Sequence, residues 1–195
     1  MDHAFFAMIA RLRWIDRWAL MRNSSNENLS EHSLEVGMLA HALALIGNRR
    51  LGKSLNPEKA AIFGMYHDVS EILTGDMPTP VKYFNPEISN AYKDIEKSAC
   101  MKLLQLLPDD LKDDYSEAMM PEDDKYSYEK RLVKGADKLS AYIKCVDELK
   151  TGNTEFKSAK SATLKALHAL ELEEVEIFIK EFLPAYSKTL DEIKP

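Results

Sequence analysis

The sequence predicts an all-α protein. Apolar residues recur at three- and four-residue spacing along most of the 195-residue chain, which is the period of an amphipathic helix. No run of alternating β-branched and polar residues, the pattern typical of a half-buried strand, interrupts this spacing. The composition is 45% hydrophobic and 30% charged, as in ordinary globular proteins. Because a chain of this length builds one core and contains no repeat or linker, we expect a single helical domain over residues 1–195.

Two helices are expected in the first 50 residues, separated by a polar stretch at 23–28. The first helix is marked by apolar residues at helical spacing: Phe5, Ile9 and Leu12. Ser30 is predicted as the N-cap of the second helix, because its hydroxyl can accept from the first backbone N–H groups. The apolar side chains of this second helix are Leu34, Met38 and Leu45.

A strong helix start lies at Asn56, where an asparagine cap precedes a proline and a glutamate. This third helix is predicted to run to about Leu73. An ordered loop over 74–80 is expected next, because a glycine and two prolines fall there.

Five further helices are predicted from the same periodicity, at 87–107, 109–119, 128–151, 154–170 and 172–183. Cys100 and Cys145 fall inside helical segments without CxxC spacing. We therefore interpret both as reduced core thiols rather than as a disulfide or metal ligands.

The charge and the hydropathy exclude two classes of partner. A net charge of −6 argues against binding to polymeric nucleic acid, which requires a basic face. The longest nearly apolar stretch, 37–47, is shorter than the roughly 20 residues of a membrane-spanning helix. The first residues show no signal-peptide pattern. We expect a cytoplasmic protein without membrane contact.

Chemistry-bearing residues concentrate in the stretch YHDVSEILTGDMPTPVK, at 66–82. On a helix His67 and Glu71 share a face, while Asp68 lies about 100° around from His67. A histidine and an aspartate so placed can converge on one ion.

Two distant residues add to this set. His32 stands in the first turn of the second helix, and Asp137 lies on the border of an apolar stripe. A buried carboxylate without a partner costs several kcal/mol, so Asp137 needs a metal or a cation. A salt bridge to Lys134 or Lys138 is the alternative.

These residues resemble a known signature. His32, the His67-Asp68 pair and Asp137 resemble the H…HD…D pattern of HD-domain metal-dependent phosphohydrolases. The string H-D-x-x-E-x-x-x-x-D-x-P-T-P-x-K, ending at Lys82, resembles the bacterial 5′-deoxynucleotidases of the YfbR type. RWALMRN at 17–23 and SEHSLEV at 30–36 do so too, although the family often has proline where this chain has alanine after RW.

The resemblance implies a single helical HD domain, a homodimer, and removal of the 5′ phosphate from deoxyribonucleoside 5′-monophosphates. It implies one divalent metal per chain, bound by His32, His67, Asp68 and Asp137. Two imidazoles and two carboxylates suit cobalt, manganese, nickel, zinc or iron better than magnesium. It also suggests catalytic roles for Glu71 and Asp76.

The expected substrate contacts come from both halves of the site. Arg17 can hold a phosphate through two parallel hydrogen bonds, and Trp18 beside it can read the sugar. The other candidate substrate residues are His32, Asp76, Thr79, Lys82 and Asp137; for the phosphate, Arg22 and Lys82 are weaker candidates than Arg17. Purely structural roles remain as alternatives: Trp18 as a core residue, Asp76 as a turn former, and Thr79 as a residue buried in the loop.

Two other functions fit the same residues. One is an HD phosphohydrolase acting on nucleoside triphosphates, cyclic dinucleotides or guanosine alarmones. Alarmone hydrolases usually follow their HD pair with Glu-Asp, whereas Glu71 is followed here by Ile72. The other is a non-catalytic HD module that senses a ligand; Glu71 and Asp76 argue against it, since a scaffold does not need them.

Overall fold

A computed structural model describes residues 3–82 and 84–193. The regular elements in these residues are all helices, accompanied by one isolated β-bridge between Asp16 and Asn28. The α-helices are α1 (Phe5–Ile9), α2 (Leu29–Arg50), α3 (Pro57–Tyr66), α4 (Glu71–Thr74), α5 (Thr79–Lys82), α6 (Pro86–Leu104), α7 (Lys112–Met119), α8 (Asp123–Lys150), α9 (Lys157–His168) and α10 (Glu173–Glu181). Short 3₁₀ helices are η1 (Ala10–Trp14), η2 (Asp109–Leu111), η3 (Thr154–Phe156), η4 (Leu183–Ser187) and η5 (Leu190–Glu192).

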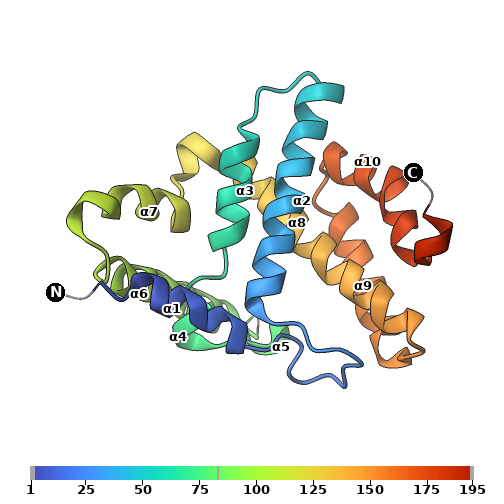
Figure 1. Cartoon of the computed structure of the whole chain (residues 1–195), viewed down its shortest axis with the longest axis horizontal. Helices are drawn as coiled ribbons and strands as arrows, with labels where there is room; N and C mark the ends of the chain where they lie inside the picture. The colour runs from blue at the N-terminus through green and yellow to red at the C-terminus, as the bar shows by residue number, and fades with distance from the viewer. Residues whose placement is uncertain (1–2, 83, 194–195) are drawn as a thin grey trace.

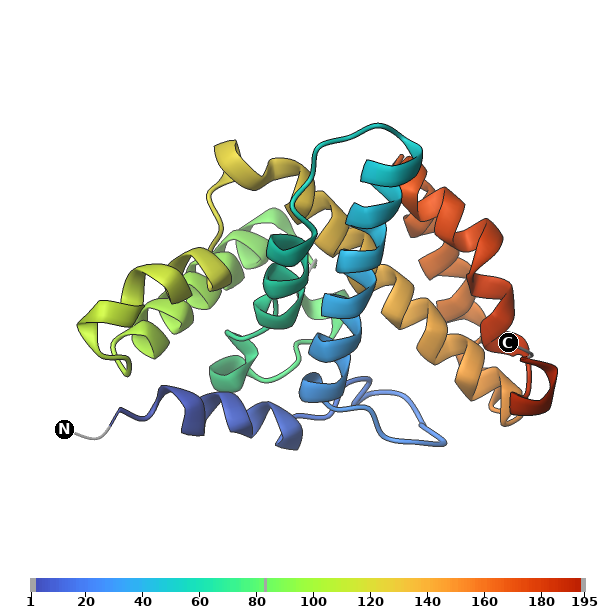
Figure 2. The same ribbon diagram turned by 45° about the horizontal axis from the view of Figure 1, so that its top comes forward.

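Three helices form the centre of the molecule. Helix α2 packs against both α3 and α8, and α3 also packs against α8. Helices α9 and α10 lie at one end of this centre, beside the C-terminus, whereas α1, α6 and α7 lie at the other end (Figure 1). The view in Figure 2 shows the same separation.

Two hydrophobic clusters follow this division. The larger one joins the central helices to α9 and α10, and Leu43, Leu132 and Leu139 are fully buried in it. The smaller one lies under α1, α6 and α7 and includes Phe5 and Val69. Cys100 and Cys145 are buried free thiols, as expected. Within the described part of the chain, none of the helices is both long and apolar enough to cross a membrane.

Helix α2 differs from the prediction in its cap, and the apolar residues that marked it lie on its exposed side. Its N-cap is Asn28, not Ser30, because the Asn28 side chain accepts from the backbone N–H of both Ser30 and Glu31. The three apolar residues that marked this helix in the sequence are exposed, Leu34 by 53%, Met38 by 57% and Leu45 by 38%. The helix is apolar around most of its circumference, so periodicity alone did not identify the covered side.

The helix predicted from Asn56 to Leu73 is broken in the middle. Helix α3 ends at Tyr66, and α4 begins only at Glu71. Between them the chain turns through tight i→i+3 bonds, from Val69 N to Tyr66 O at 3.2 Å and from Glu71 N to Asp68 O at 3.0 Å. The predicted loop is also shorter, since α5 begins within it.

The remaining predicted helices are found with shifted ends. Helix α8 begins at Asp123, ahead of the predicted start, and a non-helical residue at Tyr126 kinks its first part. The predicted ranges 109–119 and 154–170 each begin with a 3₁₀ turn, η2 and η3, before the α-helix.

Candidate active site

Three of the predicted ligands lie together where α2 meets the turn after α3. His32, His67 and Asp68 offer ligand atoms that all lie within 4.8 Å of one another. Asp68 Oδ2 is 2.9 Å from His67 Nε2 and 3.6 Å from His32 Nε2. The break between α3 and α4 therefore positions two neighbouring residues toward a third that comes from the first turn of α2.

Asp137, on α8, lies at the edge of this group. Its Oδ1 is 3.3 Å from His32 Nε2, and its side chain is 36% exposed. The described residues show no ion pair from Asp137 to Lys134 or Lys138; its cationic neighbour is Arg17, whose Nη2 lies 3.9 Å away. The alternative of a solvent-side lysine bridge is therefore wrong.

The hydrogen bonds of the two histidines prepare their Nε2 atoms for a cation. His67 Nδ1 lies 2.8 Å from the Gly64 carbonyl oxygen, to which only a protonated Nδ1 can donate. The Nε2 atoms of His67 and His32 are both buried and make no well-aligned hydrogen bond, although carboxylate oxygens lie 2.9 Å from the first and 3.3 Å from the second. Two such nitrogens that face two carboxylates fit a divalent metal ion.

The second nitrogen of His32 has two neighbours. Its Nδ1 lies 3.0 Å from Ser140 Oγ and 2.7 Å from Arg17 Nη1. Arg17 can donate to Nδ1 only when the proton is on Nε2, and a metal on Nε2 excludes that tautomer. With a metal bound, His32 donates instead to Ser140, which in turn donates to Glu35 Oε2 at 2.5 Å.

The electrostatics of the site call for positive charge. Burial lowers the pKa of His67, but the adjacent Asp68 carboxylate outweighs it and raises that pKa to about 9. Burial raises the pKa of Asp68, but the His67 imidazolium more than compensates. The pKa of this carboxyl group therefore lies well below its usual value, and the group stays ionised. In the metal-free protein a proton on His67 therefore supplies the charge that a cation would supply.

Glu71 begins α4 one turn beyond His67 and is only 4% exposed. Burial raises its pKa to about 9, with further contributions from the Asp68 and Asp76 carboxylates. Its Oε2 is buried without a hydrogen-bond partner. This carboxyl group thus holds a proton at neutral pH and has a free oxygen.

Asp76 follows Gly75, whose φ of 72° turns the chain back toward the site. Burial raises the pKa of Asp76, whereas the Arg17 guanidinium lowers it. The Trp18 backbone also lowers this pKa, so the Asp76 carboxyl lies near the loop that carries Arg17 and Trp18.

Arg17 and Trp18 lie on the segment between η1 and α2. Arg17 Nη1 and Trp18 Nε1 each donate at 2.9 Å to the same oxygen, Glu27 Oε2. The indole packs against Phe156 with ring centroids 5.4 Å apart, and the Trp18 side chain is neither fully buried nor exposed.

Lys82 and Thr79 are placed less favourably for substrate. Lys82 Nζ forms an ion pair with Glu96 Oε1 at 2.7 Å and lies over the Tyr92 ring. Its charge still acts on Glu71. Thr79 is exposed at the start of α5, so it is not buried in the turn.

Sequence reasoning missed the residues that support the site. They are Glu27, Glu35, Glu96 and Ser140. Two of them carried a readable signal: Glu35 follows His32, and Ser140 follows Asp137, each by three residues and so on a neighbouring face of the same helix. Glu27 and Glu96 are joined to their partners across loops, which periodicity does not reveal.

The helical fold and a His-His-Asp cluster, in which His32 is buried and the other two are half-buried, define a metal-dependent phosphohydrolase of the HD type. Residues 4–186 match the family described as 5′-deoxynucleotidase YfbR-like. The chain belongs to this family, as its resemblance implied.

Relatives with known names agree. The chain is 50% identical over 189 residues to a 5′-deoxynucleotidase of Erwinia tasmaniensis, covering 97% of this chain and 95% of the relative. It is 50% identical over 192 residues to 5′-deoxynucleotidase YfbR of Escherichia coli, covering 97% and 94%.

Solved structures confirm the predicted all-α HD fold. An HD-domain phosphohydrolase of Listeria innocua superposes with a TM-score of 0.81 at 24% identity, covering 94% of this chain and 88% of that one. The cyanophage S-2L HD phosphohydrolase bound to dA and one catalytic Zn²⁺ superposes with a TM-score of 0.68 at 21% identity, covering 94% and 96%.

Proposed function

We propose that this 5′-deoxynucleotidase hydrolyses deoxyribonucleoside 5′-monophosphates to deoxyribonucleoside and phosphate at one divalent transition-metal ion. The ligands are His32, His67, Asp68 and Asp137. The observation that carries the proposal is the pair of buried Nε2 atoms that face two carboxylates without a well-aligned hydrogen bond. The names of the relatives support the substrate, and the single Zn²⁺ in the cyanophage enzyme's description supports one ion.

The metal is cobalt, manganese, nickel, zinc or iron, since the mixed nitrogen and oxygen ligands suit these ions. When bound, such an ion lowers the pKa of a coordinated water and polarises a phosphoryl oxygen. The protein's own task is then to align the phosphate and to neutralise its charge.

Arg17 is the phosphate ligand of the chain. Its guanidinium is 3.9 Å from Asp137, so it lies at the edge of the ligand group. Two of its N–H groups can bind two phosphate oxygens in parallel, which fixes orientation as well as charge. Lys82 adds a positive charge near Glu71, but it contributes through space because Glu96 already pairs with it.

Glu71 and Asp76 handle the protons. A carboxyl group that holds a proton, as the raised pKa of Glu71 indicates, can give that proton up and take another in return. We assign Glu71 Oε2 to move a proton between the attacking water and the leaving 5′ oxygen. Asp76 orients Arg17 and the Trp18 backbone, and it stays close enough to Glu71 to keep that pKa raised.

Trp18 selects the sugar. An indole presents an apolar face and one N–H donor, and Glu27 already accepts from that donor. A ribose 2′-hydroxyl pressed against the ring face would lose water without finding a partner. Rejection of an added hydroxyl by such a surface is typically about 10²-fold. The motifs contain no reader of base edges, so selection by Trp18 is insensitive to the base.

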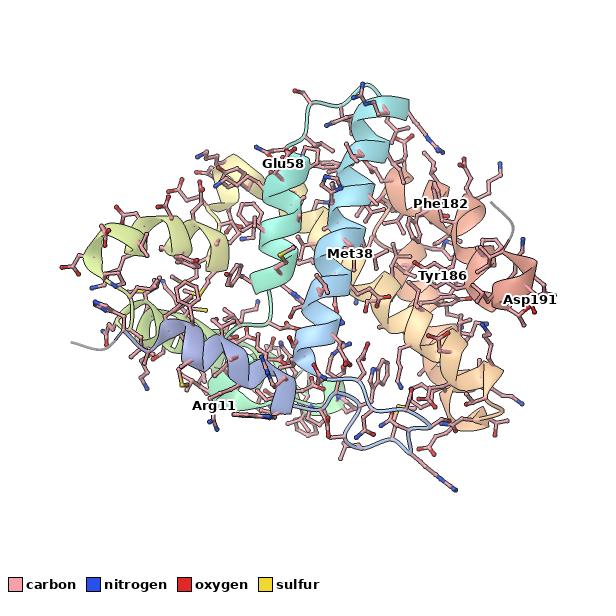
Figure 3. The ribbon with its side chains drawn as sticks, in the orientation of Figure 1. Arg11, Met38, Glu58, Phe182, Tyr186 and Asp191 are labelled. Carbon is pink, nitrogen blue, oxygen red and sulfur yellow. The ribbon has the colours of Figure 1, made fainter. Side chains whose placement is uncertain are left out.

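The same proposal includes a homodimer of single-domain chains in the cytoplasm. The family resemblance implies the dimer, and an exposed apolar row on α2, formed by Leu34, Met38 and Leu45, offers a surface for it. Figure 3 shows Met38 on the outward side of α2. The single domain covers residues 1–195.

A phosphate-release screen tests this function. Chelator-stripped protein is refilled with each divalent metal in turn and offered ribo- and deoxyribonucleoside mono-, di- and triphosphates. We expect release from the deoxyribonucleoside monophosphates with transition metals, and little with magnesium. Preferred release from triphosphates would instead support the other HD phosphohydrolases, and no turnover with any pair would support a ligand sensor.

A further inference from the structure

We propose that Glu27 holds Arg17 and Trp18 together as one substrate-reading unit, and that the preference for deoxyribose depends on it. This inference rests on the proposed roles of Arg17 and Trp18. A single oxygen, Glu27 Oε2, accepts from Arg17 Nη1 and from Trp18 Nε1, both at 2.9 Å. A phosphate ligand and a sugar reader are therefore connected through one carboxylate.

The backbone of Trp18 needs such a restraint. Its φ is 61°, in the left-handed region that bulky side chains rarely adopt. A conformation of this kind persists only when the surroundings over-determine it. Asn23 Nδ2 donates to the Trp18 carbonyl at 3.2 Å, and Phe156 packs on the indole. The bond to Glu27 is the one that fixes the rotation of the ring, because Nε1 is its only polar atom.

Glu27 is joined to Arg17 at two points. The backbone N–H of Arg17 donates to the Glu27 carbonyl oxygen at 2.9 Å, in addition to the ion pair between the side chains. The bridge between Asp16 and Asn28 closes the same loop one residue further out. Glu27 and Arg17 thus keep one fixed register across the loop, and the guanidinium retains further N–H groups for a phosphate.

Glu27 acts through its neighbours and does not touch the reacting atoms. Its side chain is only 13% exposed, and two donors occupy one of its oxygens. Glu27 is therefore a positioning residue whose loss changes what the site selects before it changes how the metal is held.

The test compares three variants of the metal-loaded enzyme. Glu27→Ala removes both hydrogen bonds, Glu27→Gln keeps an oxygen that accepts from the indole, and Glu31→Ala removes an exposed carboxylate four residues on as a control. We expect Glu27→Ala to narrow the ratio of kcat/KM for dAMP over AMP roughly tenfold, a large part of what a hydroxyl-rejecting surface supplies. Glu27→Gln should retain most of the parental ratio, and Glu31→Ala all of it.

A fluorescence measurement makes the test independent of turnover. In a Trp14→Phe background Trp18 is the one remaining tryptophan, and Glu27→Ala should increase its quenching by acrylamide while Glu27→Gln leaves it nearly unchanged. If Glu27→Ala keeps both the parental ratio and the parental quenching, the role of Glu27 is wrong. A parental enzyme without any sugar preference would overturn the role of Trp18 itself, and the selectivity part of the proposal with it.

Discussion

A side chain on Gly64 would place its Cβ 2.8 Å from the Cα of Gly37, so α3 and α2 meet backbone to backbone at these two glycines. His32 lies a little over one turn before Gly37, and His67 lies a little under one turn after Gly64. The close crossing brings the centroids of the two imidazole rings to 5.2 Å from each other. The geometry of the ligand group therefore depends on two residues that bind nothing.

Gly64→Ala should destabilise the protein and loosen the metal site. The new methyl group meets backbone that cannot move aside, and overpacking of this kind lowers the free energy of unfolding by about 1–3 kcal/mol. The higher helix propensity of alanine offsets up to about 1 kcal/mol of this loss. Gly135→Ala is the matched control, since the added Cβ there meets a side-chain methyl of Val175 at 2.9 Å. Urea unfolding compares the two, and equal stabilities would contradict the crossing as the critical contact.

Ser140→Ala and Glu35→Gln should each weaken metal binding without abolishing it. Ser140 accepts from metal-bound His32 and donates to Glu35, and loss of such outer partners typically costs 10–100-fold in metal affinity. Competition with a metal chelator measures the affinity. Ser33→Ala is the control, because Ser33 is buried beside His32 but its hydroxyl has no partner. An unchanged affinity in both variants would show that this chain of hydrogen bonds is incidental.

Glu71→Gln should separate chemistry from binding. The variant keeps the shape of the side chain and replaces the titratable carboxyl group with an amide, so turnover should fall by roughly 10²-fold or more. Bound metal and the affinity for a deoxyribonucleoside monophosphate should remain at parental levels. A variant that turns over at a near-parental rate would make Glu71 structural.

Glu148 should make folding stability sensitive to acid. This buried carboxylate is costly to desolvate, but Lys144, Asn153 and the Ser24 backbone N–H lower its pKa to about 2. Its folded pKa lies below the unfolded one, so its stabilisation is complete above the ordinary glutamate pKa and is lost as pH falls toward about 2. The difference in unfolding free energy between the parent and Glu148→Gln should therefore shrink between pH 5 and about 2. A difference that stays constant from pH 7 to about 2 would contradict this.

The sequence predicted the ligand group better than the elements that hold it. His32, His67 and Asp68 carry imidazole and carboxylate groups, which are typical metal ligands wherever they occur in a sequence. The structure brings their ligand atoms within 4.8 Å of one another. The break after Tyr66 was not predicted, because the apolar period continues through it. The covered face of α2 could not be read either, since its apolar residues surround the helix.

Side-chain contacts across loops were also not predicted from the sequence. The carboxylate of Glu27 reaches residues ten and nine positions earlier in the chain. Such a pairing depends on how the loop folds back, which neither helical periodicity nor a short motif encodes. The position of Asp137 left a metal and a lysine salt bridge both open, and the resemblance to the H…HD…D signature assigned it to the metal. Its exposed fraction of 36% shows that its need for a positive partner is weaker than the position suggested.

The metal content of His67→Ala and Asp68→Ala, measured by elemental analysis together with phosphate release, tests the central claim most directly. Each variant leaves three ligands, and an open site of this kind then holds its ion poorly. His41→Ala, which removes a histidine from α2 outside the ligand group, is the control. We expect both site variants to lose bound metal and turnover together while circular dichroism stays that of the parent. Undiminished metal in both variants would contradict the assignment of this site.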